Sequence, residues 1–257
     1  MSDNVKNDKD NFDKEVDWLI REKYGGLRTG RTEKDITRLK SGEPVDYVIG
    51  FVEFLGCKID LSLRPLIPRP ETEFWVEKMI TEMKSEKLEN PKCLDIFSGS
   101  GCVGISILKH IPTSSFDFVD LEEQSLNQIK LNCKQNNIDP ERYNIIKSDM
   151  FSSIADKYDY IFANPPYIAK NKKNEIQKSV LNYEPHTALF GGDDGLLYIK
   201  KFLTQVSAHL NKNGKIYMEF GSDQKDSVAK ILSDKNFAKT EFRKDQFGKW
   251  RFVVVKV

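Results

Sequence analysis

The sequence predicts an α/β protein with a Rossmann-like fold, in which helices cover both faces of a mostly parallel sheet. Two observations favour this class. From Pro91 onwards, short apolar segments alternate with stretches whose apolar residues recur at helical spacing. A glycine-rich turn also joins the first of these apolar segments to the stretch that follows it. Neighbouring parallel strands need long crossovers, usually helices, so the alternation indicates a parallel sheet.

Residues 1–41 predict a short helical region. The stretch 1–14 is polar, mixes acids with bases and lacks the pattern of a targeting signal, so we expect a frayed tail. Apolar residues then recur at helical spacing in 16–20, and Gly25-Gly26 ends that helix. A second short helix is expected in 32–39.

Residues 42–70 predict a linker and a β-hairpin. The apolar residues in 51–63 alternate loosely around Gly56, which is typical of two short strands joined by a turn. Three prolines in 64–70 exclude a helix interior or a central strand there. The chain therefore enters its main domain through a rigid, extended segment.

Residues 71–257 predict that main domain. The first helix places apolar residues on one face, with acids in its first turn, where the helix dipole favours them. The expected strands lie at 93–97, 116–119, 143–146, 158–163 and 215–220, with an antiparallel pair at 237–242 and 250–257. Helices are expected at 99–109, around 126–133, at 199–210 and at 224–232.

Composition excludes several classes of protein. A formal net charge of +1 does not suit a dedicated nucleic-acid binder, and no apolar run reaches the ~18 residues of a membrane span. The four cysteines form no Cys-x-x-Cys pair and the three histidines are scattered, so we expect no metal site and a reducing, cytoplasmic location. A monomer is expected. Lysines at 170, 172, 173 and 178 form either a basic patch or a solvated loop.

A glycine loop indicates a cofactor that contains adenosine. Residues 99–104 fit the G-x-G-x-x-G pattern between a strand and a helix. Asp120 ends the next strand, where an acid can bind both ribose hydroxyls, or it caps the following helix. Asp149 can accept from the adenine amino group, with Met150 or Phe151 against the ring or in the core. These residues alone fit a nicotinamide cofactor as well as S-adenosylmethionine.

The segment Asn164-Pro165-Pro166-Tyr167 favours S-adenosylmethionine. It follows an apolar strand, and its prolines predict a rigid loop. The Asn164 amide oxygen and the Pro165 carbonyl can both accept from one NH₂ group, because Pro166 has no N–H to compete. Such a clamp orients an amine or amide nitrogen toward an electrophilic methyl. Tyr167 is expected to pack on the substrate or, alternatively, at the base of the loop.

Four segments together resemble the peptide chain release factor glutamine N5-methyltransferases. They are Gly42-Glu43-Pro44, Ile67-Pro68-Arg69-Pro70-Glu71-Thr72-Glu73, 164–167, and 183–192 with Asp194-Gly195-Leu196. The resemblance runs from about Gly42 to the C-terminus. It implies a seven-stranded S-adenosylmethionine-dependent methyltransferase sheet with a terminal hairpin. It also implies a substrate, the glutamine in the Gly-Gly-Gln loop of release factors.

The resemblance implies roles for particular residues. Asn164 to Tyr167 would hold the substrate glutamine, with Asn164, Pro165 and Tyr167 catalytic. The cofactor would lie against Phe97, Ser98, Gly99, Ser100, Gly101, Asp120, Met150 and Asn164, and Asp149 joins this set from the argument on adenine. Arg69, held between two prolines, is expected to border the cofactor or to tie the N-terminal helices to the sheet. Glu71 and Thr72 are expected at the start of a helix beside the pocket or, alternatively, as a first-turn charge and a cap, and Glu73 is expected as a first-turn charge.

The chain departs from the family pattern in two places. Phe97 stands where the family usually has glycine, so its side chain must point away from the cofactor or reshape the pocket. The N-terminal helical region is also shorter than usual. Three alternatives stay open: a ribosomal-protein glutamine methyltransferase, which the 67–73 segment resembles less; a DNA or RNA adenine N6-methyltransferase; and a non-catalytic nucleotide-binding module.

Overall fold

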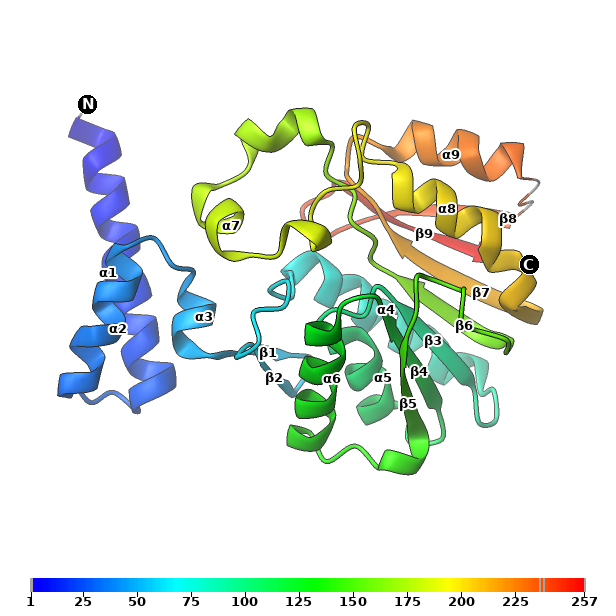
Figure 1. Cartoon of the computed structure of the whole chain (residues 1–257), viewed down its shortest axis with the longest axis horizontal. Helices are drawn as coiled ribbons and strands as arrows, with labels where there is room; N and C mark the ends of the chain where they lie inside the picture. The colour runs from blue at the N-terminus through cyan, green and yellow to red at the C-terminus, as the bar shows by residue number, and fades with distance from the viewer. Residues whose placement is uncertain (1, 236, 238, 257) are drawn as a thin grey trace.

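The computed structural model describes residues 2–235, 237 and 239–256. A helical N-terminal region stands at one end of the molecule, beside the sheet domain (Figure 1). Its helices are α1 (Ser2–Tyr24), α2 (Gly30–Lys40) and α3 (Val45–Ile49). The expected fraying of 1–14 is wrong for the backbone from Ser2 onwards, which is helical.

The N-terminal helices have a small core of their own. Its buried residues come from all three helices and are Val16, Leu19, Ile20, Ile36, Leu39, Val45, Val48 and Ile49. Glu43 of the Gly-Glu-Pro segment is buried beside this core and accepts from the Arg38 and Arg64 guanidiniums. The segment thus holds the last turn of α2 against the linker. The division of the chain at residues 41 and 70 stays a prediction.

A hairpin follows, formed by β1 (Phe51–Phe54) and β2 (Cys57–Asp60). Three amides on one face of a helix, α6 (Glu123–Gln135) and its C-cap, fix the hairpin and the chain after it. Asn136 accepts from the Lys58 N–H, Asn132 from the Asp60 N–H and Gln128 from the Leu63 N–H, at 2.8 to 3.0 Å. These bonds anchor the hairpin and the start of the segment 63–69 to α6.

The seven-stranded sheet has the order β5-β4-β3-β6-β7-β9-β8. Its strands are β3 (Lys92–Ile96), β4 (Ser115–Asp120), β5 (Tyr143–Lys147), β6 (Tyr158–Ala163), β7 (Leu210–Glu219), β8 (Lys239–Lys244) and β9 (Trp250–Lys256). The first five pair in parallel, and β9 pairs antiparallel with β7 and β8. The predicted fold class, including the terminal antiparallel pair, is confirmed; Ala238 and Val257 of that prediction lie outside the described residues.

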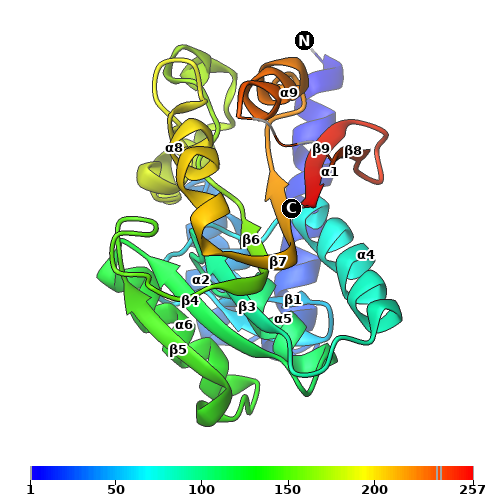
Figure 2. The ribbon, with the colours of Figure 1, turned by 90° about the vertical axis from the view of Figure 1, so that its right-hand side faces the viewer.

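Helices cover the two faces of the sheet, as Figure 2 shows. One core contains the apolar faces of α4 (Pro70–Glu86), α5 (Cys102–His110) and α6, and the other contains those of α8 (Leu197–Gln205) and α9 (Lys225–Asp234). Successive strand residues alternate between the two cores: Phe162 packs in the first, and Ile161 and Ala163 in the second. A lobe of short turns and α7 (Lys178–Tyr183), for which we made no prediction, lies between β6 and α8.

Strand order explains where a site forms. The strand β3 lies between β4 and β6, so the chain leaves β3 toward one side of the sheet and returns on the other. In parallel sheets, ligands bind at such a switch point, beyond the carboxyl ends of the strands. The loops that follow β3, β4 and β6 carry Phe97, Leu121 and Asn164 to this edge.

Candidate active site

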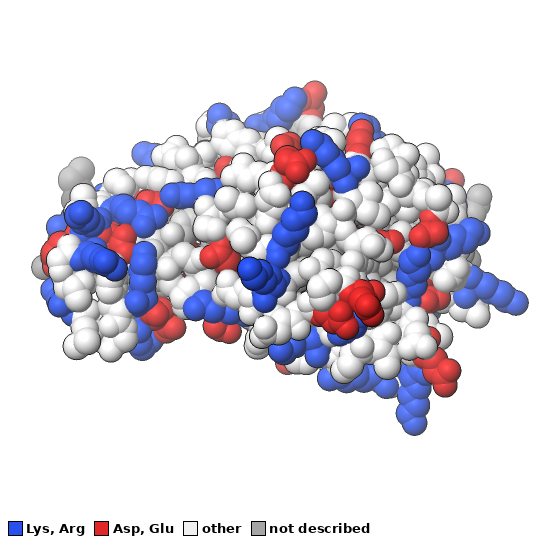
Figure 3. Space-filling view, turned by 60° about the horizontal axis from the view of Figure 1, so that its bottom comes forward, with Lys and Arg blue, Asp and Glu red and all other residues white. Residues whose placement is uncertain are grey.

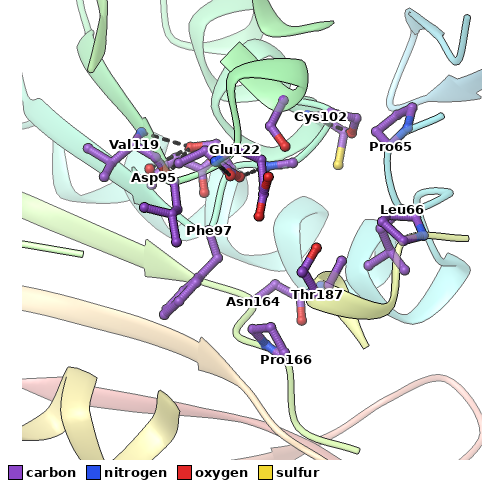
Figure 4. A pocket seen from close by; sticks show the side chains of 18 of the residues that line it. Pro65, Leu66, Asp95, Phe97, Cys102, Val119, Glu122, Asn164, Pro166 and Thr187 are labelled. Carbon is purple, nitrogen blue, oxygen red and sulfur yellow. Dashed lines mark hydrogen bonds between the residues drawn. The ribbon is translucent and has the colours of Figure 1, made fainter. Parts of the chain in front are cut away.

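A cavity lies at the predicted edge of the sheet. Its wall includes the glycine loop, the end of β4, the loop after β6, the segment 63–69 and part of the α7 lobe. In Figure 4, Asp95 and Glu122 lie at one side of the cavity, while Asn164, Pro166 and Thr187 lie at another. The structure therefore brings together residues that are widely separated in the sequence.

The glycine loop makes a tight turn between β3 and α5. The Gly101 N–H donates to the Ser98 carbonyl at 2.7 Å, and Gly101 has a φ of 78°, which favours glycine. A Cβ on Gly104 would lie only 2.3 Å from the Phe118 ring, so α5 packs against β4 only with glycine there. Ser98 and Ser100 are buried within the turn. The predicted loop thus has the conformation that the motif requires.

Phe97 has a left-handed backbone, with a φ of 62°. This explains why glycine suits the position, since a side chain there costs roughly 1–2 kcal/mol. Its ring points away from Asp95 and Glu122 (Figure 4) and packs edge-on against Tyr198, with ring centroids 5.9 Å apart. The ring therefore forms part of the cavity wall without blocking the glycine loop.

Asp120 braces the glycine loop from the neighbouring strand. One carboxylate oxygen accepts from the Gly99 N–H at 2.8 Å and the other from the Glu122 N–H at 3.0 Å. Burial raises the pKa of this carboxyl above its ordinary value. The bond to Glu122 closes a turn before α6, whose N-cap is Glu122, so Asp120 does not cap the helix. Asp120 borders the cavity, and its contact with a ribose stays a prediction.

Asp95 is a cavity residue that we did not predict. It is buried in β3, and burial raises the pKa of its carboxyl to about 8. Among the described residues, its Oδ2 atom is the one buried side-chain oxygen or nitrogen without a hydrogen-bond partner. An unpaired buried carboxylate oxygen suits a cationic ligand group. The sequence did carry a signal, since an acid interrupts the apolar strand directly before the glycine loop.

The loop after β5 contains the residues predicted for adenine. Asp149 and Met150 both border the cavity; Asp149 is exposed and Met150 is buried with a φ of 51°. Phe151 packs in the core, stacked on Phe202 at 5.8 Å, which confirms the core interpretation for this residue. Met150 belongs to the same core while it borders the cavity. The roles of Asp149 and Met150 stay predictions.

The loop after β6 places Asn164 and Pro166 in the cavity wall. Asn164 is half-buried, and its side-chain Nδ2 donates to Thr72 Oγ1 at 3.4 Å. The Tyr167 hydroxyl lies behind the loop, where it donates to Glu219 at 3.1 Å. That position is the one expected for packing at the loop base, and contact between Tyr167 and a substrate stays a prediction. Pro165 is buried beside Asn164.

Glu219 is a second buried acid that we did not predict. It ends β7 and is 1% exposed, and it accepts from Thr72 Oγ1, Trp75 Nε1 and the Tyr167 hydroxyl. Burial raises the pKa of its carboxyl. Thr72 therefore faces inward and borders the cavity, as the first interpretation expected, and it does not cap α4. Glu73 instead accepts from the Leu55 N–H, which ties α4 to the hairpin turn.

Arg69 and Glu184 join the two segments that carry most of the family resemblance. The Glu184 side chain is 1% exposed and accepts from Arg69 at 2.6 Å and from the Ile67 N–H at 3.1 Å. Arg69 thus borders the cavity and ties the α7 lobe to the proline-rich segment, a pairing that the sequence did not predict. Two of the lysines after the Asn164 loop, Lys170 and Lys172, pair with acids on the surface, as a solvated loop does.

The surface charges are mixed in sign, and no cluster of metal ligands occurs among the described residues. Lys, Arg, Asp and Glu side chains are interspersed over the face in Figure 3. Within the described residues, no group of three His, Cys, Asp or Glu side chains could hold a metal ion. The same residues contain no helix that is long and apolar enough to cross a membrane.

Fold and site together define an α/β methyltransferase. The family model "Methyltransferase small domain" matches residues 72–193. Solved structures of similar fold include the catalytic domain of hMettl16 with an RNA hairpin (TM-score 0.60, 19% identity, 79% of this chain and 76% of that one). Another is the N-terminal domain of human METTL16 with SAH (TM-score 0.56, 18% identity, 79% and 76%).

Curated relatives define the family more closely. The chain is 37% identical over 239 residues to the release factor glutamine methyltransferase of Lactococcus lactis, which covers 93% of this chain and 86% of the relative. It is 35% identical over 237 residues to that of Flavobacterium psychrophilum, covering 91% and 82%. The chain belongs to the release factor glutamine methyltransferase family.

Proposed function

We propose that this protein transfers a methyl group from S-adenosylmethionine to the side-chain amide nitrogen of the glutamine in the Gly-Gly-Gln loop of peptide chain release factors. The observation that carries the proposal is the position of the Asn164 amide. Its nitrogen donates a hydrogen bond to Thr72 Oγ1, so its oxygen is left for a ligand in the cavity. Family membership supplies the substrate class.

The cavity residues fit this cofactor. The unpaired Asp95 Oδ2 suits the ammonium of its methionine part, and Asp120 suits the ribose hydroxyls. Met150 and Asp149 would border the adenine, while Phe97, Ser98, Gly99 and Ser100 would lie along the amino-acid part. Gly101 is not among the lining residues and would act by closing the turn. When bound, the cofactor supplies an electrophilic methyl on a positively charged sulfur.

The loop that contains Asn164 would hold the substrate amide nitrogen, which is a poor nucleophile, in position for attack. A carboxamide nitrogen shares its lone pair with its carbonyl, so it attacks slowly unless it is held in position. The Asn164 Oδ1 atom and the Pro165 carbonyl would each accept one hydrogen of the glutamine NH₂, and Pro166 has no N–H to occupy that carbonyl. Positioning of this kind contributes up to ~7–11 kcal/mol in favourable cases, and fixed dipoles stabilise the developing charge.

No strong base is needed before attack in this scheme. The amide nitrogen becomes acidic as it gains the methyl, and the acceptors that hold its hydrogens are already in place. The nitrogen then releases one proton to solvent. The proposal includes a monomeric enzyme in the cytoplasm, where its substrate acts, and the four buried, unpaired cysteines suit that reducing compartment.

Mass spectrometry of a purified release factor tests the proposal. Incubation with the enzyme and S-adenosylmethionine is expected to add one methyl to the Gly-Gly-Gln glutamine. Asn164→Ala is expected to lower turnover by ~10²–10³, the range for loss of one preorganised polar group, with little effect on cofactor binding. Asn127→Ala, on an exposed position of α6, is the matched control. Near-normal turnover in Asn164→Ala would remove the proposed clamp.

The same assay separates the alternatives. Methyl transfer to ribosomal protein, DNA or RNA, with none to the release factor, would assign the clamp to a different substrate. Tight binding of S-adenosylmethionine without transfer to any of them would instead indicate a nucleotide-binding module.

A further inference from the structure

The Asn164 amide has two ends of similar shape but opposite hydrogen-bonding character. Only one orientation offers its oxygen to a substrate NH₂ group. The reverse orientation would aim two N–H donors at the NH₂ hydrogens and repel them. The enzyme therefore needs a device that selects one orientation of this side chain.

Two residues next to Asn164 form such a device: Thr72, which also borders the cavity, and Glu219, which is not among the lining residues. Asn164 Nδ2 lies 3.4 Å from Thr72 Oγ1, and Thr72 Oγ1 lies 2.7 Å from Glu219 Oε2. The three groups come from the loop after β6, the first turn of α4 and the end of β7. A hydroxyl has one hydrogen, so if Thr72 gives it to Glu219, only lone pairs remain for Asn164.

Trp75 fixes the direction of the bond between Thr72 and Glu219. Its indole Nε1–H can only donate, and it donates to the same Glu219 Oε2 atom at 2.8 Å. An ionised carboxylate can only accept. In a protonated carboxyl the proton is favoured on Oε1, because Trp75 can only donate to Oε2, whereas the Tyr167 hydroxyl at Oε1 can also accept. Thr72 donates to Glu219 in both states, and it must accept from Asn164.

We propose that Thr72 and Glu219 are positioning residues that hold the Asn164 amide with its nitrogen to the rear and its oxygen toward the substrate. This inference rests on the proposed function, because it concerns how the same clamp is oriented. Trp75 belongs to the device as the donor that sets its polarity. Thr72, Glu219 and Trp75 can have this effect without touching the reacting atoms.

Burial makes the device rigid. Thr72, Trp75 and Glu219 are each no more than 2% exposed, so water does not compete for these bonds. The second Glu219 oxygen accepts from the Tyr167 hydroxyl at 3.1 Å, which ties the other end of the loop to the same carboxyl. One buried acid therefore anchors both Asn164 and Tyr167.

Substitutions at Thr72 test the inference. Thr72→Val removes the hydroxyl at nearly constant volume and is expected to lower kcat about tenfold, the factor that one hydrogen bond supports. Thr72→Ser keeps the hydroxyl and is expected to restore most of the loss. Thr81→Val, the same change at an exposed position of α4, is the control. Melting temperature and S-adenosylmethionine Kd identify a variant that merely misfolds.

A double-mutant cycle separates positioning from structure. If Thr72 acts through Asn164, Thr72→Val lowers kcat in the wild type but not in Asn164→Ala, whose amide is already absent. Losses that multiply in the double variant would overturn the inference. Glu219→Gln is expected to stay within about threefold of wild type, because Trp75 keeps the amide oxygen facing Thr72. A tenfold loss there would show that charge, not orientation, is what matters.

A measurement without substrate completes the test. In the free enzyme, ¹⁵N NMR of the Asn164 side chain is expected to show one NH₂ hydrogen protected from exchange in the wild type and Thr72→Ser, and unprotected in Thr72→Val. Equal exchange in all three would overturn the orientation device even if the release factor is methylated. Protection without any methylation of the release factor would instead retain the device and refute the proposed function.

Discussion

The unpaired oxygen of Asp95 predicts that cofactor binding depends on pH. Burial raises the pKa of this carboxyl to about 8, so the free enzyme holds it mostly protonated at neutral pH. An ammonium group beside Oδ2 favours the ionised form and lowers that pKa again. Binding of S-adenosylmethionine should therefore release a proton, and its affinity should rise with pH.

The size of the effect follows from that pKa. With a value of about 8, roughly 1% of Asp95 is ionised at pH 6 and roughly 10% at pH 7. If the bound form has a pKa well below 6, the Kd falls about tenfold between these two values. The folding stability of the free protein depends on pH with the opposite sign. A carboxyl whose pKa is raised on folding contributes stability that is present below about pH 4 and is lost as pH rises through about 8.

Calorimetric titration at pH 6 and pH 7 measures this dependence. Titrations in two buffers of different ionisation enthalpy count the released proton directly. Asp95→Asn should bind more weakly and show no such slope. Methylthioadenosine is the control ligand, because it keeps the adenosine and lacks the ammonium, so a slope caused by Asp120 would persist with it. A Kd that changes less than about twofold, or a slope that survives in Asp95→Asn, would refute the reasoning.

Two further predictions concern stability. At Phe97, whose φ of 62° favours glycine, Phe97→Gly should be more stable than Phe97→Ala by about 1 kcal/mol in urea unfolding, since both lose the ring and only glycine loses the strain. Equal stabilities would contradict the strain. Glu184→Ala should cost about 1–3 kcal/mol, because the Ile67 N–H and Arg69 lose their acceptor. Hydrogen exchange should quicken first at Ile67, and unchanged protection there would refute this account.

Much of the fold could be predicted because its signals are local. Apolar runs of strand length alternate with helical spacing, and Gly101 and Gly104 mark the turn and the close packing of a nucleotide-binding crossover. The loop after β6 was equally visible, since two prolines after an apolar strand leave few conformations for Asn164. These features depend on neighbours in the sequence, so the sequence alone indicates them.

The rest of the site depends on contacts between distant segments. Thr72 and Glu219 are 147 positions apart, and the polarity of their bond depends on Trp75, which the helical spacing placed only in the core. Asp95 lies among apolar residues of β3, and its raised pKa results from its complete burial. Nothing in the spacing of these residues shows that two strands, β3 and β7, and one helix, α4, carry them to the same end of the sheet.

Comparison with the other buried acids explains why we expect a ligand at Asp95. Glu43, Glu184 and Glu219 are nearly inaccessible, and each accepts hydrogen bonds from donors on other segments of the chain. Asp117 is likewise satisfied, by the Tyr158 hydroxyl. A buried acceptor without a partner is costly, and among the described residues the open carboxylate oxygen is the one in the cavity wall. That cost is offset when a cation binds, so the open oxygen of Asp95 is best understood as part of the binding site.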